Sequence, residues 1–214
     1  MRRLRLALPT FLVVAALCLC TGSALANSVK MQLTGVGGNN AGGVYTYPYY
    51  FSINGKTPVP LICDSYDNQV VVGETWQANV TSLLSGKGLF GNQLLDYKAA
   101  GLIFKGILNG TISANAGNFA IWGLFSTNAQ NSSYFQSSGA AGIESTYLAL
   151  ALTDPNSAYN GLVLYTPIAG TQSWGGTPQE YIGYNPVPEP GTITLFGTGL
   201  LSLAGMMKRK LSKT

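Results

Sequence analysis

Residues 44–63 read VYTYPYYFSINGKTPVPLIC and carry the clearest strand pattern in the chain. From Tyr45 to Ile53 every second residue is aromatic or aliphatic, and this period of two predicts a half-buried strand. Asn54-Gly55 then offers a turn with positive φ, and apolar residues alternate again up to Cys63, so we expect a hairpin. Three prolines, at positions 48, 58 and 60, favour edge positions for both strands: Pro48, Pro58 and Pro60 each lack the N–H that a central strand would need.

Outward from this hairpin, the sequence predicts strands on both sides and helices between them. Strand patterns recur at 29–36, 162–168 and 179–184. Apolar residues at helical spacing predict helices over 92–108, 116–126 and 141–152. The expected buried stripes are Leu95, Ala99, Leu102 and Ile103 in the first helix and Ile143, Tyr147 and Leu150 in the third. We therefore expect an α+β domain, with a β-sheet or partial barrel and about three helices inserted in the middle.

Charge is scarce in this chain and lies mainly at its ends. Charged residues make up 9% of the 214 positions, against about 25% in typical domains, so Asn, Ser, Thr, Gln and Tyr must cover much of the surface. The formal net charge is +4, but between residues 27 and 187 five lysines and no arginine face seven acids, a balance of about −2. This segment has no basic footprint for DNA or RNA, so we expect no nucleic-acid partner.

The first 26 residues have the three parts of a secretory signal. Met1-Arg2-Arg3-Leu4-Arg5 is positive, residues 6–20 are largely apolar, and Ala24-Leu25-Ala26 provides the small residues that signal peptidase recognises. The apolar run is short for a permanent membrane anchor. We expect signal peptidase to cut after Ala26 and to leave Asn27 at the new N-terminus.

The C-terminal residues show a motif, an apolar span and a basic tail in that order. Pro188-Glu189-Pro190 precedes the apolar stretch 191–207, and Lys208-Arg209-Lys210 follows it. Basic residues after an apolar span stay in the cytoplasm, and this span is shorter than the hydrocarbon core of about 30 Å. These features suit a signal that an enzyme reads and removes.

This tail resembles the PEP-CTERM sorting signal of Gram-negative bacteria. The resemblance implies that an exosortase recognises Pro188-Glu189-Pro190 and passes the protein to the cell envelope, surface or extracellular matrix. We therefore divide the chain into a signal peptide (1–26), an exported domain (27–187) and a sorting signal (188–214). The sorting signal contains a transmembrane helix at about 191–207, which would hold the precursor in the inner membrane with its basic tail in the cytoplasm.

Catalytic residue types are few. The chain has no histidine, which excludes a Ser-His-Asp triad and removes a common metal ligand. Asp64, Asp67 and Glu74 could supply the paired carboxylates of an enzyme that cleaves polysaccharide, but their polar neighbours favour a solvated loop. A calcium site built from Asp64, Asp67 and Asn68 lacks the spacing of the EF-hand loop. We expect no metal, no cofactor and no enzymatic activity.

Cys63 is the one cysteine that remains after removal of the signal peptide. In an oxidising compartment it therefore has no intramolecular disulfide partner. Its simplest role is that of a small buried apolar side chain beside Val59 and Leu61.

A second resemblance gives Cys63 an alternative role. Residues 61–64 (LICD), 72–76 (VGETW) and 118–122 (NFAIW) resemble motifs of bacterial thioester domains of the adhesin type. The resemblance implies that the cysteine attacks a glutamine amide and that the thioester acylates a nucleophile on a host or matrix surface. Here Asn118 stands in place of the glutamine and is one methylene shorter, and near-attack geometry is sensitive to about 1 Å. We expect Asn118 to make a structural hydrogen bond to the Cys63 strand instead.

These observations predict an exported surface or extracellular-matrix protein with a structural or adhesive role. Signal peptidase, an exosortase and the membrane are its expected processing partners, and extracellular polysaccharide is a candidate ligand because Tyr, Asn, Ser and Trp suit carbohydrate contact. The alternative is a secreted enzyme that acts on exopolysaccharide through the carboxylates of residues 64–74. Two close acids in a cleft would favour the enzyme.

Overall fold

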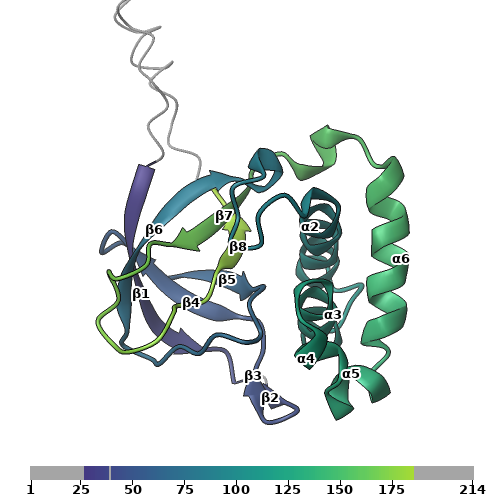
Figure 1. The fold of residues 1–214 in the computed structure, drawn as a ribbon, viewed down its shortest axis with the longest axis horizontal. Coiled ribbons are helices and arrows are strands. Elements are labelled where there is room, and N and C mark those ends of the chain that lie inside the picture. The colour runs from purple at the N-terminus through teal and green to yellow at the C-terminus, as the bar shows by residue number, and fades with distance from the viewer. Residues whose placement is uncertain (1–26, 39, 186–214) are drawn as a thin grey trace, which may run out of the picture.

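Six antiparallel strands close into a β-barrel, beside which the helices form a separate layer (Figure 1). The computed structural model describes residues 27–38 and 40–185. The barrel strands are β1 (Asn27–Val36), β4 (Tyr49–Ile53), β5 (Val59–Cys63), β6 (Thr75–Ser82), β7 (Leu162–Pro167) and β8 (Tyr181–Tyr184), in the spatial order β1-β4-β5-β8-β7-β6. The predicted α+β class is confirmed, and the predicted sheet or partial barrel is a closed barrel.

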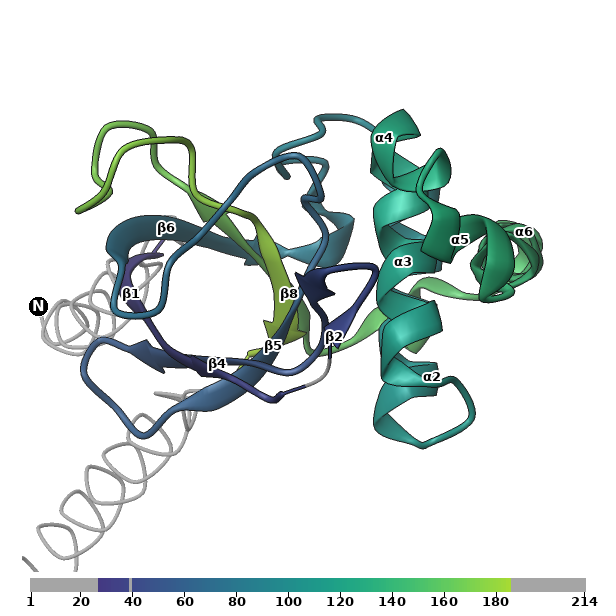
Figure 2. The same cartoon turned by 90° about the horizontal axis from the view of Figure 1, so that it is seen from below.

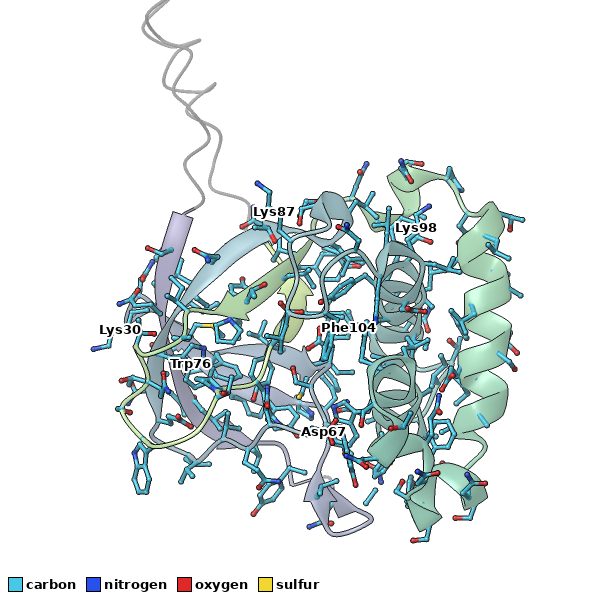
Figure 3. The ribbon with its side chains drawn as sticks, in the orientation of Figure 1. Lys30, Asp67, Trp76, Lys87, Lys98 and Phe104 are labelled. Atoms are coloured by element: carbon cyan, nitrogen blue, oxygen red, sulfur yellow. The ribbon has the colours of Figure 1, made fainter. Side chains whose placement is uncertain are left out.

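The barrel closes around aromatic side chains that alternate with outward-facing residues. Along β4, Tyr49, Phe51 and Ile53 are buried while Tyr50 and Ser52 are not. The ring of Phe51 lies 4.5 Å from that of Tyr181 and 5.5 Å from that of Trp76, and Figure 3 shows Trp76 within the barrel. Three strands distant in sequence therefore share one aromatic core, which removes a large apolar area from water.

Two long helices form a layer beside the barrel, and a third long helix packs outside them. α2 (Leu94–Leu108) and α3 (Ala114–Phe125) lie next to the barrel, and α6 (Ala140–Thr153) packs on their far side (Figure 1). Phe104 of α2 packs edge-on against Tyr47, with ring centroids 5.6 Å apart. α3 is buried along most of its length because it has the barrel on one side and α6 on the other.

Short elements connect these layers. Two short helices, α4 (Thr127–Gln130) and α5 (Ser133–Ser137), follow α3, and 3-10 turns occur at Leu83–Ser85 and Asn156–Tyr159. The strands β2 (Asn40–Ala41) and β3 (Val44–Tyr45) form a small hairpin, which lies between the barrel and α3 (Figure 2). A side chain at Gly42 of this hairpin would meet Phe119 of α3 and Tyr134 of α5 at 3.1 Å, so the close approach requires glycine.

The predicted hairpin forms, but its first strand is shorter than expected. Asn54 and Gly55 adopt positive φ values of 52° and 74°, as the turn requires. The predicted strand from Tyr45 to Ile53 is interrupted at Pro48, which has no N–H to donate. Tyr45 belongs to β3 instead and is 52% exposed, so it does not share the buried face that starts at Tyr49.

The prediction that the prolines mark edge strands is wrong, since a closed barrel has no edge strand. Pro60 lies within β5 and pairs with Tyr50 of β4. On its other side β5 pairs with β8 only from Ile62 onward. Pro60 therefore lies where β5 pairs with only one neighbouring strand. Its lack of an N–H removes no hydrogen bond between strands there.

The three predicted helices are present, and most of each predicted stripe is confirmed: Ala99 and Ile103 of α2 are fully buried, and Leu102 packs partly buried against the core. Leu95 and Leu150 are partly exposed, at 36% and 43%. In α6, Ala140 and Ala151 are buried, and the predicted Ile143 and Tyr147 are partly buried against the core. The sequence analysis did not predict β6. Trp76 and Ala78 alternate there with polar residues, but the polar composition of the strand obscured this alternation.

Several predictions lie outside the described residues. They are the signal peptide with Ala24 and Ala26, the motif Pro188-Glu189-Pro190 and the transmembrane helix at 191–207. Within residues 27–38 and 40–185, no helix combines the length and hydropathy needed to cross a membrane.

Candidate functional site

Cys63 lies at the end of β5, where the barrel meets the helical layer. Its side chain is fully buried. The N–H of Ser65 donates to Sγ at 3.3 Å, and the thiol lies 3.5 Å from the Ser65 carbonyl oxygen, which accepts from it. Burial raises the pKa of Cys63 far above its usual value, and repulsion from Asp64 adds to this. The thiol is thus protonated and shielded, which is the opposite of a nucleophile's environment.

Asn118 of α3 faces this strand and uses both ends of its amide. Its Nδ2 donates to the carbonyl oxygen of Cys63 at 2.9 Å, and its Oδ1 accepts from the Tyr47 N–H at 2.8 Å. This is the structural hydrogen bond predicted from the shorter side chain. Because the side chain is fully buried, the two bonds satisfy a group that would otherwise be costly and attach α3 to the barrel.

A buried acidic cluster lies beside Cys63. Asp64 follows Cys63 directly, and Glu180 precedes β8; both side chains are fully buried. Glu180 accepts three hydrogen bonds, from the Tyr97 hydroxyl at 2.6 Å, the Leu89 N–H at 2.8 Å and the Thr166 hydroxyl. Its backbone N–H donates to the Ser65 hydroxyl at 2.9 Å. Glu180 therefore joins α2, β7 and two loops.

Asp64 is the less satisfied partner of this pair. Its Oδ1 accepts from the Ser65 hydroxyl at 3.1 Å, while Oδ2 has no hydrogen-bond donor among residues 27–38 and 40–185. Burial raises the pKa of Asp64 well above its usual range, and repulsion from the nearby Glu180 carboxyl raises it further. Burial therefore favours the protonated, uncharged form of Asp64.

The other acids of the 64–74 segment lie apart from this pair. Asp67 is exposed and accepts from Asn128 of α4 at 2.7 Å, and Figure 3 shows it at the seam between barrel and helices. Glu74 is buried and accepts from the Val71 N–H at 3.2 Å within its own loop. The structure thus does not bring Asp64, Asp67 and Asn68 together as a calcium site. In the part of the chain that is described, no three Cys, Asp or Glu side chains are grouped as metal ligands would be.

Two cavities lie toward opposite ends of the barrel. The larger, about 1010 Å³, is lined by aliphatic residues such as Val29, Ile53 and Leu162, and by Asn185. β1 begins and β8 ends there, so the chain enters and leaves the domain beside this cavity (Figure 1). The smaller cavity, about 180 Å³, lies at the start of β4, between the β2–β3 hairpin and the loop after β5. Neither Asp64 nor Glu180 lines either cavity.

Sequence reasoning found Cys63, Asn118 and Asp64 but missed Glu180, Tyr97 and Thr166. An acid directly before the apolar residues 181–182 was the available signal, because a carboxylate next to a buried strand needs partners. The residues that donate hydrogen bonds to Glu180 are distant in sequence, so no local pattern predicts them.

Comparison with known proteins identifies the C-terminal tail. The PEP-CTERM protein-sorting motif matches residues 186–210. This motif implies an exported protein that an exosortase processes and sorts to the cell surface. No curated protein matches the chain. No solved structure matches it either. The resemblance to thioester domains therefore has no support from these comparisons.

Proposed function

We propose that this protein is a non-enzymatic surface or extracellular-matrix component with a structural or adhesive role. The observation that carries the proposal is the sorting motif at residues 186–210. Signal peptidase releases the N-terminus after Ala26, and the helix at about 191–207 holds the precursor in the inner membrane. An exosortase then acts at Pro188-Glu189-Pro190 and delivers the domain to the envelope, surface or matrix.

The surface of the domain supports this role. Only 9% of the chain is charged, and Asn, Ser, Thr, Gln and Tyr supply most of the polar side chains between residues 27 and 187. Such side chains form hydrogen bonds that salt does not screen. They suit contacts with hydroxyl-rich polymers in an environment of variable ionic strength.

The buried acids support a non-enzymatic role over the polysaccharide-degrading alternative. A glycosidase needs two carboxyl groups that reach the scissile bond from opposite sides. Asp64 and Glu180 are both fully buried and line neither cavity, and Asp67 and Glu74 are each bonded elsewhere. The donors around Glu180 are those of a structural network that holds the barrel to α2.

Substitution of the sorting motif tests the proposal. Replacing Pro188, Glu189 and Pro190 by alanine should leave precursor in the inner membrane and deplete the surface fraction, as cell fractionation with immunoblotting would show. A matched control replaces Ser212 and Thr214, which lie outside the matched range. Unchanged surface delivery in the motif variant would contradict exosortase sorting.

A further inference from the structure

The smaller cavity combines rigid aromatic walls with free polar groups. Tyr66 and Trp122 both line it, with ring centroids 5.2 Å apart, and the ring of Phe119 lies 6.1 Å from that of Tyr66. Tyr45, at the end of β3, also lines the cavity and is 52% exposed. Tyrosine supplies a large contact surface with few rotatable bonds, so little entropy is lost when a ligand packs on it.

The loop that forms the floor of the cavity is held in place by Gln179. Its Nε2 donates to the carbonyl oxygens of Asn68 at 2.7 Å and Ser65 at 3.1 Å, and its Oε1 accepts from the Tyr181 hydroxyl at 2.7 Å. Asn68 in turn donates from Nδ2 to the Pro178 carbonyl oxygen at 3.4 Å. The polar groups of residues 65–69 are therefore positioned before any ligand arrives.

Several polar groups at this cavity have no partner in the described part of the chain. They are Oδ1 of Asn68, the side-chain amide of Gln69 and the hydroxyls of Tyr45 and Tyr66. Amide and hydroxyl groups donate and accept hydrogen bonds and carry no charge. No Asp, Glu, Lys or Arg lines the cavity. The lining thus matches a neutral ligand that has both donors and acceptors.

The volume and the position of the cavity further restrict which ligands it can bind. A volume of about 180 Å³ equals that of about six water molecules, which accommodates one ring but no folded chain. The cavity lies toward the end of the barrel opposite Asn27 and Asn185, so it lies away from the end after which the sorting signal follows. A polymer outside the cell can reach it.

We propose that this cavity binds one neutral sugar residue of an extracellular polysaccharide. The sugar ring packs its C–H face on Tyr45, and its hydroxyls bond to Asn68 and Gln69. This proposal rests on the proposed function, since it names the matrix partner of the exported domain. It assigns the adhesive contact to the loop after β5 and the β2–β3 hairpin.

Calorimetric titration of the exported protein with neutral trisaccharides tests the site. The probes are maltotriose, cellotriose and mannotriose, with trigalacturonate as the anionic comparison. At least one neutral probe should bind, and Tyr45→Ala should weaken it at least tenfold. The matched control is Tyr50→Ala, since Tyr50 is 39% exposed, lies on β4 and does not line the cavity.

Three results would overturn the site. The first is that no neutral probe binds at millimolar concentration; the second is that Tyr45→Ala and Tyr50→Ala bind alike. The third is preferential binding of trigalacturonate, which would assign the cavity to an anionic polymer. Circular dichroism of both variants shows that each is folded.

Measuring how much protein is retained in the cell-surface matrix distinguishes a failure of the sugar site from a failure of the proposed surface role. If the wild type reaches the matrix and Tyr45→Ala is retained equally, the sugar site fails and the surface role stands. If the wild type never reaches the surface but binds a trisaccharide in solution, the surface role fails and the site stands.

Discussion

Replacing Glu180 by alanine tests whether the buried acidic cluster holds the barrel to the helical layer. Glu180 is fully buried and accepts from Tyr97 of α2, from Thr166 of β7 and from the Leu89 N–H in the loop before α2. Alanine removes the acceptor of all three donors.

The expected loss follows from these contacts. A hydrogen bond to a charged group contributes about 1.5–3 kcal/mol, and a buried donor left without an acceptor costs about 1–3 kcal/mol. Removing a buried carboxyl also relieves its desolvation, which offsets part of the loss. We expect Glu180→Ala to lower the free energy of unfolding by about 3–5 kcal/mol, a large fraction of the about 5–15 kcal/mol typical of domains.

Urea unfolding of the exported protein, followed by tryptophan fluorescence, measures this loss. Glu180→Gln is the conservative comparison, because it keeps an acceptor for Tyr97 but places an NH₂ group near other donors; we expect it to lose about 1–3 kcal/mol. Asp67→Ala is the control, since Asp67 is exposed and makes one hydrogen bond, to Asn128; its loss should stay below about 1 kcal/mol. A loss below about 1 kcal/mol for Glu180→Ala would refute the reasoning.

Three further predictions concern Asp64, Cys63 and Asn118. The raised pKa of Asp64 means that the folded state binds its proton more tightly than the unfolded state, whose aspartates titrate at about 3.9. The contribution of Asp64 is therefore complete below about pH 4 and declines as pH rises toward the folded pKa, by at most about 1.4 kcal/mol per pH unit. Unfolding free energies at pH 5 and pH 8 should differ less in Asp64→Asn than in the wild type; an equal difference would exclude Asp64 as the source. Cys63 should resist alkylation until the protein is unfolded, because it is fully buried and protonated, and intact mass should show no loss of ammonia. A missing thiol together with that loss would mean that a thioester forms. Asn118→Ala should lower the unfolding free energy by about 2–4 kcal/mol, since two hydrogen bonds between α3 and the barrel are lost, whereas Asn128→Ala, which loses only the bond to Asp67, should lower it by less than about 1 kcal/mol; equal losses would contradict a special role for Asn118.

The sequence predicted those features whose cause is local. Asn54-Gly55 turns the chain because these two residues tolerate positive φ, and the alternation of Tyr49, Phe51 and Ile53 follows from the two-residue period of a strand. The structural hydrogen bond of Asn118 was also predictable, since a buried amide on a helix face requires partners. The sorting motif is likewise a linear signal, and its match needs no fold.

Predictions failed where contacts between distant segments outweighed local patterns. Tyr45 was expected beside Tyr49 on one strand, but packing of the β2–β3 hairpin against α3 takes it away. Leu150 was expected in the buried stripe of α6, but it is 43% exposed, whereas Ala140 and Ala151 of the same helix are buried. In both cases the geometry of the neighbouring element selects the face that is buried.

By itself the sequence therefore determined the class of the fold, its main turn, most of its elements and the signal at its C-terminus. Only the tertiary structure closed the barrel, through the pairing of Ile62 with Ile182 and of Cys63 with Tyr181. That closure places Ser65 against Glu180, 115 positions later, and so assembles the acidic cluster and the floor of the small cavity. The physical reason is that hydrogen-bond partners and cavity walls come from segments that meet only in the folded chain, whereas turn and strand preferences are set by each residue and its immediate neighbours.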